Sequence, residues 1–185
     1  VKNRLDSDRR CYGFFHPRLP GEPLIFVEVA LINEIAASIT PLLDESAEAA
    51  DLDRATTAIF YSISNTQAGL RGVSFGDSLI KRVVESLHEE FPRLKTFATL
   101  SPIPGLRSWL AKHAPAELLQ AWEAAPELVE KSPPRVALKQ WAARYLGREL
   151  QDGKPLDAVA RFHLGNGARV ERLNWAADPS AKGFK

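Results

Sequence analysis

The chain has 185 residues, 45% of them hydrophobic, and carries 24 Lys and Arg against 23 Asp and Glu, for a formal net charge of +1. A chain of this length and composition can bury a sizeable core, so we expect one globular domain over residues 1–185. The balanced charge gives no overall field to favour nucleic acid or an anionic membrane as a partner. An anionic ligand would have to be bound by a local site.

Metal and membrane signals are also missing from the sequence. Cys11 is the only cysteine, so an internal disulfide and a zinc centre built on several cysteines are both excluded. No pair of histidines, or of histidine and glutamate, has a metal-ligand spacing on a helix face, and we predict no metal. The apolar runs are too short for a membrane span, and the first residues lack a secretory signal. These features favour the cytoplasm, or an organelle matrix in a eukaryotic cell.

The first half of the chain is predicted to alternate strands with a long helix. Apolar and β-branched residues predict buried strands over 24–32 and 57–64. Apolar residues at helical spacing then predict a helix over 75–91 that packs on a sheet and ends before Pro92. A third strand is predicted within 94–102, where prolines stop it.

The second half is predicted to be rich in helix. Apolar residues spaced in threes and fours predict helices over 105–113, 116–124, 136–150 and 156–164. The alternating stretch RVERLNWAA, residues 169–177, predicts a closing strand. The fold class is therefore α/β, with a mixed β-sheet flanked by helices and an α-rich insertion before the last strand.

A glycine-rich stretch separates the second predicted strand from the long helix. TQAGLRGVSFG, residues 66–76, holds three glycines within eight residues. Successive backbone N–H groups in such a turn, set before a helix N-terminus, can form an anion site. A glutamine followed by glycines resembles the pyrophosphate loop of the GNAT-fold acyltransferases, whose pattern is Gln-x-x-Gly-x-Gly. An ordinary connection between strand and helix is the alternative interpretation.

Five blocks between residues 9 and 178 carry a wider resemblance. They are RRCYGFFHPRLPGEPLIFVEVAL, FYSISNTQAGLRGVSFG, LIKRVV, TLSPIPGLRSWL and FHLGNGARVERLNWAAD. In these blocks the chain resembles the catalytic region of the malonyl-CoA decarboxylases. The resemblance implies a GNAT-like α/β domain that converts malonyl-CoA into acetyl-CoA and carbon dioxide without a cofactor. It also implies that the chain is part of a longer protein with an upstream helical domain. The longer protein is expected to form homo-oligomers.

The resemblance assigns two sets of site residues. It places the catalytic pair at Ser101 and His163, which would protonate the thioester enolate left by loss of carbon dioxide. It gives the binding of the CoA pyrophosphate to the glycine loop: Gln67, Ala68, Gly69, Leu70, Arg71 and Gly72.

Three further residues are minor candidates for orienting the substrate. Asn166 follows the predicted catalytic histidine closely in the sequence. Glu28 is a carboxylate within an apolar strand, where burial requires a partner or a place in a site. Ser74 stands where some members of the family carry a glutamate, so the chain supplies no carboxylate at that position.

Other interpretations stay open at this point. Ser101 before Pro102 also fits a turn residue at the end of a strand, and His163 fits a helix C-terminal residue that interacts with the helix dipole. Either member of the pair could deliver the proton. Two other functions are a GNAT-type acyltransferase, against which the SPIPG and FHLGNGA blocks argue, and a non-catalytic acyl-CoA-binding module.

Overall fold

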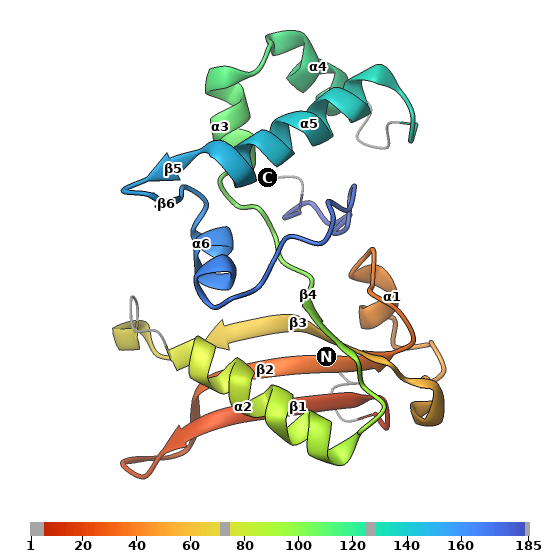
Figure 1. Cartoon of the computed structure of the whole chain (residues 1–185), viewed down its shortest axis with the longest axis vertical. Coiled ribbons are helices and arrows are strands. Elements are labelled where there is room, and N and C mark those ends of the chain that lie inside the picture. The colour runs from red at the N-terminus through yellow and green to blue at the C-terminus, as the bar shows by residue number, and fades with distance from the viewer. Residues whose placement is uncertain (1–5, 71–74, 125–128, 184–185) are drawn as a thin grey trace. The chain divides into compact units, whose positions relative to one another are not determined.

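The computed structural model describes residues 6–70, 75–124 and 129–183. It divides into two compact units, residues 1–100 and 101–185. The first unit contains a four-stranded β-sheet, and the second contains helices and one short β-hairpin (Figure 1). The mixed α/β fold class predicted from the sequence is confirmed. That the whole chain acts as one catalytic domain stays a prediction.

The first unit is built on a four-stranded sheet in the order β1-β2-β3-β4. The β1–β2 and β2–β3 pairs are antiparallel, and β3–β4 is parallel, so the sheet is mixed. In chain order the elements are β1 (Arg9–His16), β2 (Leu19–Ile32), α1 (Thr40–Leu43), a 3-10 helix (Leu52–Arg54), β3 (Thr57–Asn65), a second 3-10 helix (Ala68–Leu70), α2 (Phe75–Glu90) and β4 (Thr96–Thr99).

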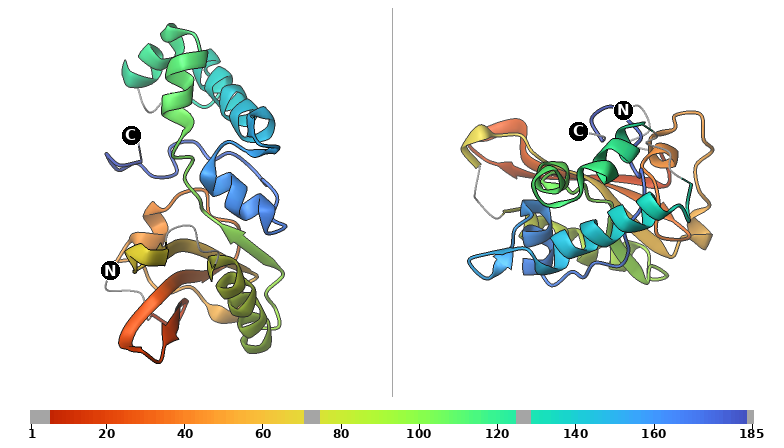
Figure 2. Two further views of the ribbon diagram at one scale, coloured as in Figure 1. Left: turned by 90° about the vertical axis from the view of Figure 1, so that its left-hand side faces the viewer. Right: turned by 90° about the horizontal axis from the view of Figure 1, so that it is seen from above.

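Helix α2 covers one face of this sheet (Figures 1 and 2). It can do so because its apolar residues recur every four positions, which places Leu79, Val83 and Leu87 on one side of the helix. They join a buried cluster with alternate residues of β2, among them Val27 and Val29. Each of these side chains is at most 4% exposed, so this layer is the main core of the unit.

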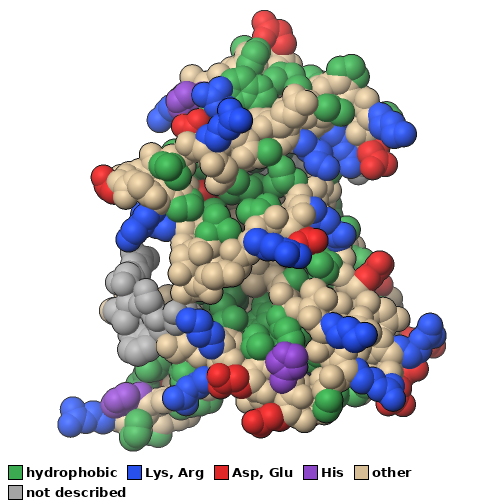
Figure 3. Space-filling model, viewed as in Figure 1, with side chains coloured by type: hydrophobic (Ala, Val, Ile, Leu, Met, Phe, Trp, Pro, Cys, Tyr) green, Lys and Arg blue, Asp and Glu red, His purple; other side chains and the backbone are tan. Residues whose placement is uncertain are grey.

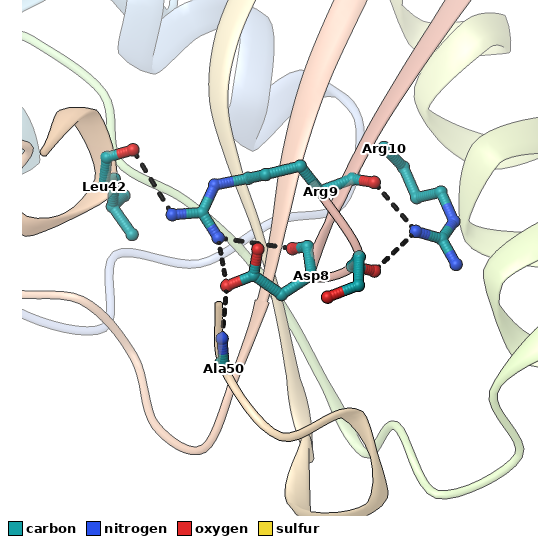
Figure 4. A network of polar contacts seen from close by, with 6 residues as sticks. Asp8, Arg9, Arg10, Leu42 and Ala50 are labelled. Atoms are coloured by element: carbon teal, nitrogen blue, oxygen red, sulfur yellow. Dashed lines mark hydrogen bonds and ion pairs between the residues drawn. The ribbon is translucent and has the colours of Figure 1, made fainter. Parts of the chain in front are cut away.

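The opposite face of the sheet is covered in part by the segment that connects β2 to β3. Ala30 and Ile59 pack there with Leu42 of α1. The start of β1 is tied to the same segment by a buried ion pair (Figure 4). Arg9 Nη1 lies 2.6 Å from the Asp8 carboxylate, which also accepts the backbone N–H of Ala50 at 2.7 Å.

The second unit packs helices around aromatic side chains. Trp109, Leu110, Leu138 and Tyr145 form its buried cluster, and the Trp109 and Tyr145 rings lie 5.2 Å apart. Its elements are α3 (Leu106–His113), α4 (Ala116–Ala124), α5 (Pro133–Arg148), the short strands β5 (Leu150–Gln151) and β6 (Lys154–Pro155), and α6 (Ala158–Gly165).

Two features of the fold differ from the sequence prediction. The prediction of a closing strand over 169–177 is wrong, because these residues belong to no strand. Alternation of apolar and polar residues is typical of an extended chain. A β-strand also needs a neighbouring strand with which its backbone N–H and C=O groups form hydrogen bonds. The α-rich region therefore follows the sheet and is not an insertion before a last strand. The sequence also missed β1, an edge strand whose side chains are mostly exposed or half-buried.

Charged side chains are mixed on the surface. Lys and Arg side chains are scattered among Asp and Glu over the face shown in Figure 3. None of the helices within the described residues combines the length and the apolar character needed to cross a membrane.

The core beneath α2 leads to a stability prediction. Leu87 is fully buried, so Leu87→Ala removes apolar contacts and leaves a cavity, and should lower the free energy of unfolding by about 2–5 kcal/mol. Leu43→Ala is the control, because Leu43 is 43% exposed, and should cost about 0.5 kcal/mol. Urea unfolding followed by circular dichroism measures both, and equal losses in the two variants would contradict this core assignment.

Candidate active site

Ser101 and His163 lie next to one another in the second unit. The Ser101 Oγ is 3.0 Å from the His163 Nε2, although the residues are 62 positions apart in the chain. Ser101 is exposed and His163 is half-buried. The structure therefore brings together the two residues that the family resemblance selected, within hydrogen-bond distance and open to solvent on the serine side.

The end of α6 fixes the backbone of His163. The N–H of Gly167 donates to the carbonyl of Leu164, and the N–H of Ala168 donates to the carbonyl of His163, each at 3.1 Å. These are the two hydrogen bonds of a Schellman motif, which needs a left-handed residue after the helix. Gly167 provides it with φ of +86°. The sequence Gly-Asn-Gly-Ala thus ends the helix at Gly165, shortly after the histidine.

Asn166 supports this helix end. Its side-chain amide donates to the carbonyl of Phe162 at 2.8 Å, and its backbone N–H donates to the carbonyl of His163 at 3.1 Å. The observed role of Asn166 is therefore to cap the helix that carries His163, and its predicted role in orienting substrate is untested.

The start of α6 is held by Asp157, which is 2% exposed. Its Oδ1 accepts the N–H groups of Val159 at 3.0 Å and Ala160 at 2.9 Å, as an N-cap residue does. Its Oδ2 accepts the N–H of Gly105 at 3.4 Å, four positions after Ser101. One carboxylate thus joins the segment of Ser101 to the helix of His163.

Tyr145 of α5 completes this arrangement. Its hydroxyl donates a hydrogen bond to Asp157. Burial, and then the nearby Asp157 charge, raise the pKa of Tyr145 above its usual 10.0, so the phenol stays protonated as a donor. A side chain at Gly105 would overlap the Tyr145 hydroxyl. The glycine of the SPIPG block is therefore required by close packing, since its backbone is in an ordinary helical conformation.

Burial lowers the pKa of His163 below its usual 6.5. The imidazole is therefore mainly neutral near pH 7, with one ring nitrogen able to donate and the other able to accept. The Phe162 and His163 rings are packed edge to face, with ring centroids 5.0 Å apart. Chemically, the pair can hold a proton between a hydroxyl and an imidazole and pass it to a bound ligand.

The predicted pyrophosphate loop belongs to the first unit. It follows β3, and Ala68–Leu70 form a 3-10 helix. The side-chain amide of Gln67 lies 3.4 Å from the Glu22 carboxylate. Arg71 and Gly72 of the predicted loop lie outside the described residues, as does Ser74, the minor candidate for orienting the substrate, so both assignments are untested.

The spacing of the loop also needs a correction. Relative to Gln67, the glycines at 69 and 72 give Gln-x-Gly-x-x-Gly, which differs from the GNAT pattern in the place of the first glycine. The comparison with GNAT loops therefore depends on the strand before and the helix after.

Glu28 is buried on the central strand β2, as the sequence suggested. It pairs across the sheet with Cys11 of β1 and Ser62 of β3, next to a bulge in the β2–β3 pairing. It belongs to the first unit, and its role in orienting substrate is untested.

Within the part of the chain that the structure describes, no group of three or more His, Cys, Asp and Glu side chains is placed so that it could hold a metal ion. Of the other histidines, His113 stacks on Trp109 with ring centroids 4.7 Å apart, and His88 lies 4.6 Å from the Phe97 ring. His113 lies on α3 and His88 on α2.

The sequence analysis did not identify Asp157 and Tyr145 as residues that hold the Ser–His segments in place. It also did not explain why residue 105 is a glycine. An aspartate immediately before an apolar helical pattern is an N-cap signal, so the helix start at Asp157 could have been recognised. Nothing local in the sequence shows that the second carboxylate oxygen reaches a residue 52 positions away.

The fold and the Ser–His pair together define an α/β protein with the side chains of an acid–base site. Residues 1–185 match the family model described as the malonyl-CoA decarboxylase C-terminal domain. The chain therefore belongs to the malonyl-CoA decarboxylase family.

Curated relatives agree with this family. The chain is 40% identical over 218 residues to the mitochondrial malonyl-CoA decarboxylase of Mus musculus, covering all of this chain and 44% of the relative. It is 38% identical over 221 residues to that of Anser anser anser, covering all of this chain and 43% of the relative. The chain thus spans less than half the length of these curated relatives.

Solved structures of the family are also similar. The malonyl-CoA decarboxylase of Rhodopseudomonas palustris matches with a TM-score of 0.82 at 48% identity, covering 96% of this chain and 47% of that chain. The enzyme of Cupriavidus metallidurans matches with a TM-score of 0.76 at 51% identity, covering 98% and 50%.

The Schellman motif leads to a prediction on backbone conformation. Gly167→Ala places a Cβ at positive φ and should lower the free energy of unfolding by about 1 kcal/mol. Gly147→Ala is the matched control, because Gly147 lies within α5 with open space around it and alanine favours helix. Urea unfolding compares them, and a Gly167→Ala variant as stable as Gly147→Ala would argue against the motif.

The lowered pKa of His163 leads to a prediction on pH. The folded chain binds this proton less readily than the unfolded chain, so stability should fall as pH drops from 6.5 through the folded pKa. NMR titration of the ring, assigned with His163→Asn, should give a midpoint below 6.5. The wild type should also lose more stability on acidification than His163→Asn, and a midpoint at or above 6.5 would show that burial does not control the ring.

Proposed function

We propose that the chain catalyses the decarboxylation of malonyl-CoA to acetyl-CoA and carbon dioxide, with Ser101 and His163 as the catalytic residues. The observation that carries the proposal is the 3.0 Å contact between the serine hydroxyl and the imidazole. Membership of the malonyl-CoA decarboxylase family supports the reaction and the substrate.

The chemistry suits a site that supplies hydrogen bonds and one proton. Malonyl-CoA carries its carboxylate β to the thioester carbonyl. When the bond to the carboxylate breaks, carbon dioxide leaves and the electron pair passes into a thioester enolate. Hydrogen-bond donors stabilise the charge on its oxygen, and one proton added to carbon gives acetyl-CoA. The electron balance needs no oxidant or reductant.

The exposure of the two side chains suggests the order of the proton relay. Ser101 is exposed and His163 is half-buried, so the hydroxyl meets the substrate and the imidazole replaces the proton that the hydroxyl gives up. Burial lowers the pKa of His163, and this makes its protonated form a stronger acid.

The loop from Gln67 to Gly72 binds the CoA pyrophosphate through its backbone N–H groups. The reaction uses neither metal nor cofactor, and neither nucleic acid nor membrane is a partner. The longer protein forms homo-oligomers. It works in the cytoplasm or in an organelle matrix, and the relatives' names place them in mitochondria.

The test is carbon dioxide and acetyl-CoA formation from malonyl-CoA by the purified chain. Ser101→Ala and His163→Asn should each lower kcat at least about a hundredfold, because each removes a member of the proton relay. Binding of CoA should be nearly unchanged, and a metal chelator should have no effect. Ser108→Ala and His16→Asn are the controls, because both residues are exposed and outside the pair.

Other outcomes identify other functions. Wild-type turnover in either Ser101→Ala or His163→Asn would refute the catalytic pair. CoA binding without carbon dioxide release would indicate an acyl-CoA-binding module, and transfer of an acyl group to an added amine would indicate an acyltransferase.

A further inference from the structure

The two oxygens of the Asp157 carboxylate have different partners. Oδ1 accepts two N–H groups at the start of α6, at 3.0 and 2.9 Å. Oδ2 accepts the N–H of Gly105 at 3.4 Å, and the carboxylate also receives the hydroxyl of Tyr145. Helix capping needs only the first oxygen. The hydrogen bonds from Gly105 and Tyr145 therefore call for a separate explanation.

Together with the Ser–His contact, these contacts join two chain segments at both of their ends, and we call this closed arrangement the frame. Ser101 precedes Gly105 by four positions, and His163 follows Asp157 by six. Four extended residues span at most about 14 Å, and six helical residues rise about 9 Å. The two segments meet at one end through Ser101 and His163, at 3.0 Å, and at the other through Gly105 and Asp157.

Both sides of the frame are stiff. One side is α6, a helix with a cap at each end. The other side contains Pro102 and Pro104, whose rings fix φ. Tyr145 is 3% exposed and packs on Trp109, so α5 holds the carboxylate from a third direction. A movement at Asp157 is therefore transmitted to the distance between the serine and the imidazole.

We propose that Asp157 is a positioning residue of the Ser101–His163 pair and sets their contact through Gly105 and α6. This rests on the proposed function of the pair. The substrate does not touch Asp157 in this mechanism. Its buried carboxylate accepts hydrogen bonds on both oxygens, so the serine segment and the histidine helix keep one relative placement while the proton moves.

The substitution Asp157→Asn distinguishes the proposed positioning role of Asp157 from its role as the N-cap of α6. An asparagine caps a helix as well as an aspartate does, but its amide has one acceptor and one donor end. If its oxygen caps α6, its NH₂ group faces the N–H of Gly105, which is also a donor. If it turns over, the cap is lost.

The experiment measures kinetics and the His163 titration in the full chain. Asp157→Asn should lower kcat for malonyl-CoA at least about tenfold and change KM less than about twofold, because reacting groups are misplaced while binding is kept. The NMR midpoint of His163 should rise toward 6.5 as the loosened ring is rehydrated. Asp152→Asn is the matched control, on the exposed β5–β6 turn with φ of +53°, which asparagine tolerates.

A second variant keeps the proposal testable if Asp157→Asn does not fold. Tyr145→Phe removes only the hydroxyl that donates to Asp157, and should shift the His163 midpoint in the same direction. Where both variants fold, the double variant should lose no more kcat than Asp157→Asn alone, since both act on one contact. Additive losses would contradict action through a shared contact.

The proposal is overturned if folded Asp157→Asn keeps both the wild-type kcat and the wild-type His163 titration. It is also overturned if Tyr145→Phe is folded and leaves the titration unchanged. Failure of the proposed function would look different, because the wild type would release no carbon dioxide. The titration needs no turnover and still decides the positioning role.

Discussion

A carboxylate buried among apolar groups must have both oxygens hydrogen-bonded, and in the second unit this requirement organises the site. Asp157 satisfies it with the first turn of α6, the start of α3 at Gly105, and the hydroxyl of Tyr145 on α5. Helices α3, α5 and α6 are thus fixed to one group, and the start of α3 lies 52 positions from it in the sequence. The geometry of the Ser–His pair follows from that fixation.

The first unit depends on a different constraint, the burial of apolar surface. The alternation of β2 gives the sheet two apolar faces, one for α2 and one for the segment around α1. Two charged residues buried beside this layer, Asp8 and Arg9, form an ion pair with one another. Burying such a pair adds little to stability by itself, but removing one member would leave an uncompensated charge.

The sequence predicted elements where apolar periodicity was long. The helix predicted over 116–124 coincides with α4, and the one over 75–91 agrees with α2 within one residue. Strands were harder, because pairing depends on a neighbour. The edge strand β1 was missed, and residues 169–177 have the alternation of a strand but no strand pairing. The contact between Ser101 and His163 was expected from the family resemblance. Asp157 was not, because its second oxygen acts across 52 positions.

The sequence separation within the Ser–His pair has a kinetic consequence. Joining residues 62 positions apart closes a loop that contains α3, α4, α5 and the β5–β6 hairpin. The entropy lost on closing a loop increases with its length, so contacts within each helix form before this one. The loop-closure entropy therefore predicts that the Ser–His pair forms after the helices during folding and separates before they unfold. Loss of the pair would then report the first loosening of the second unit, before its helices melt.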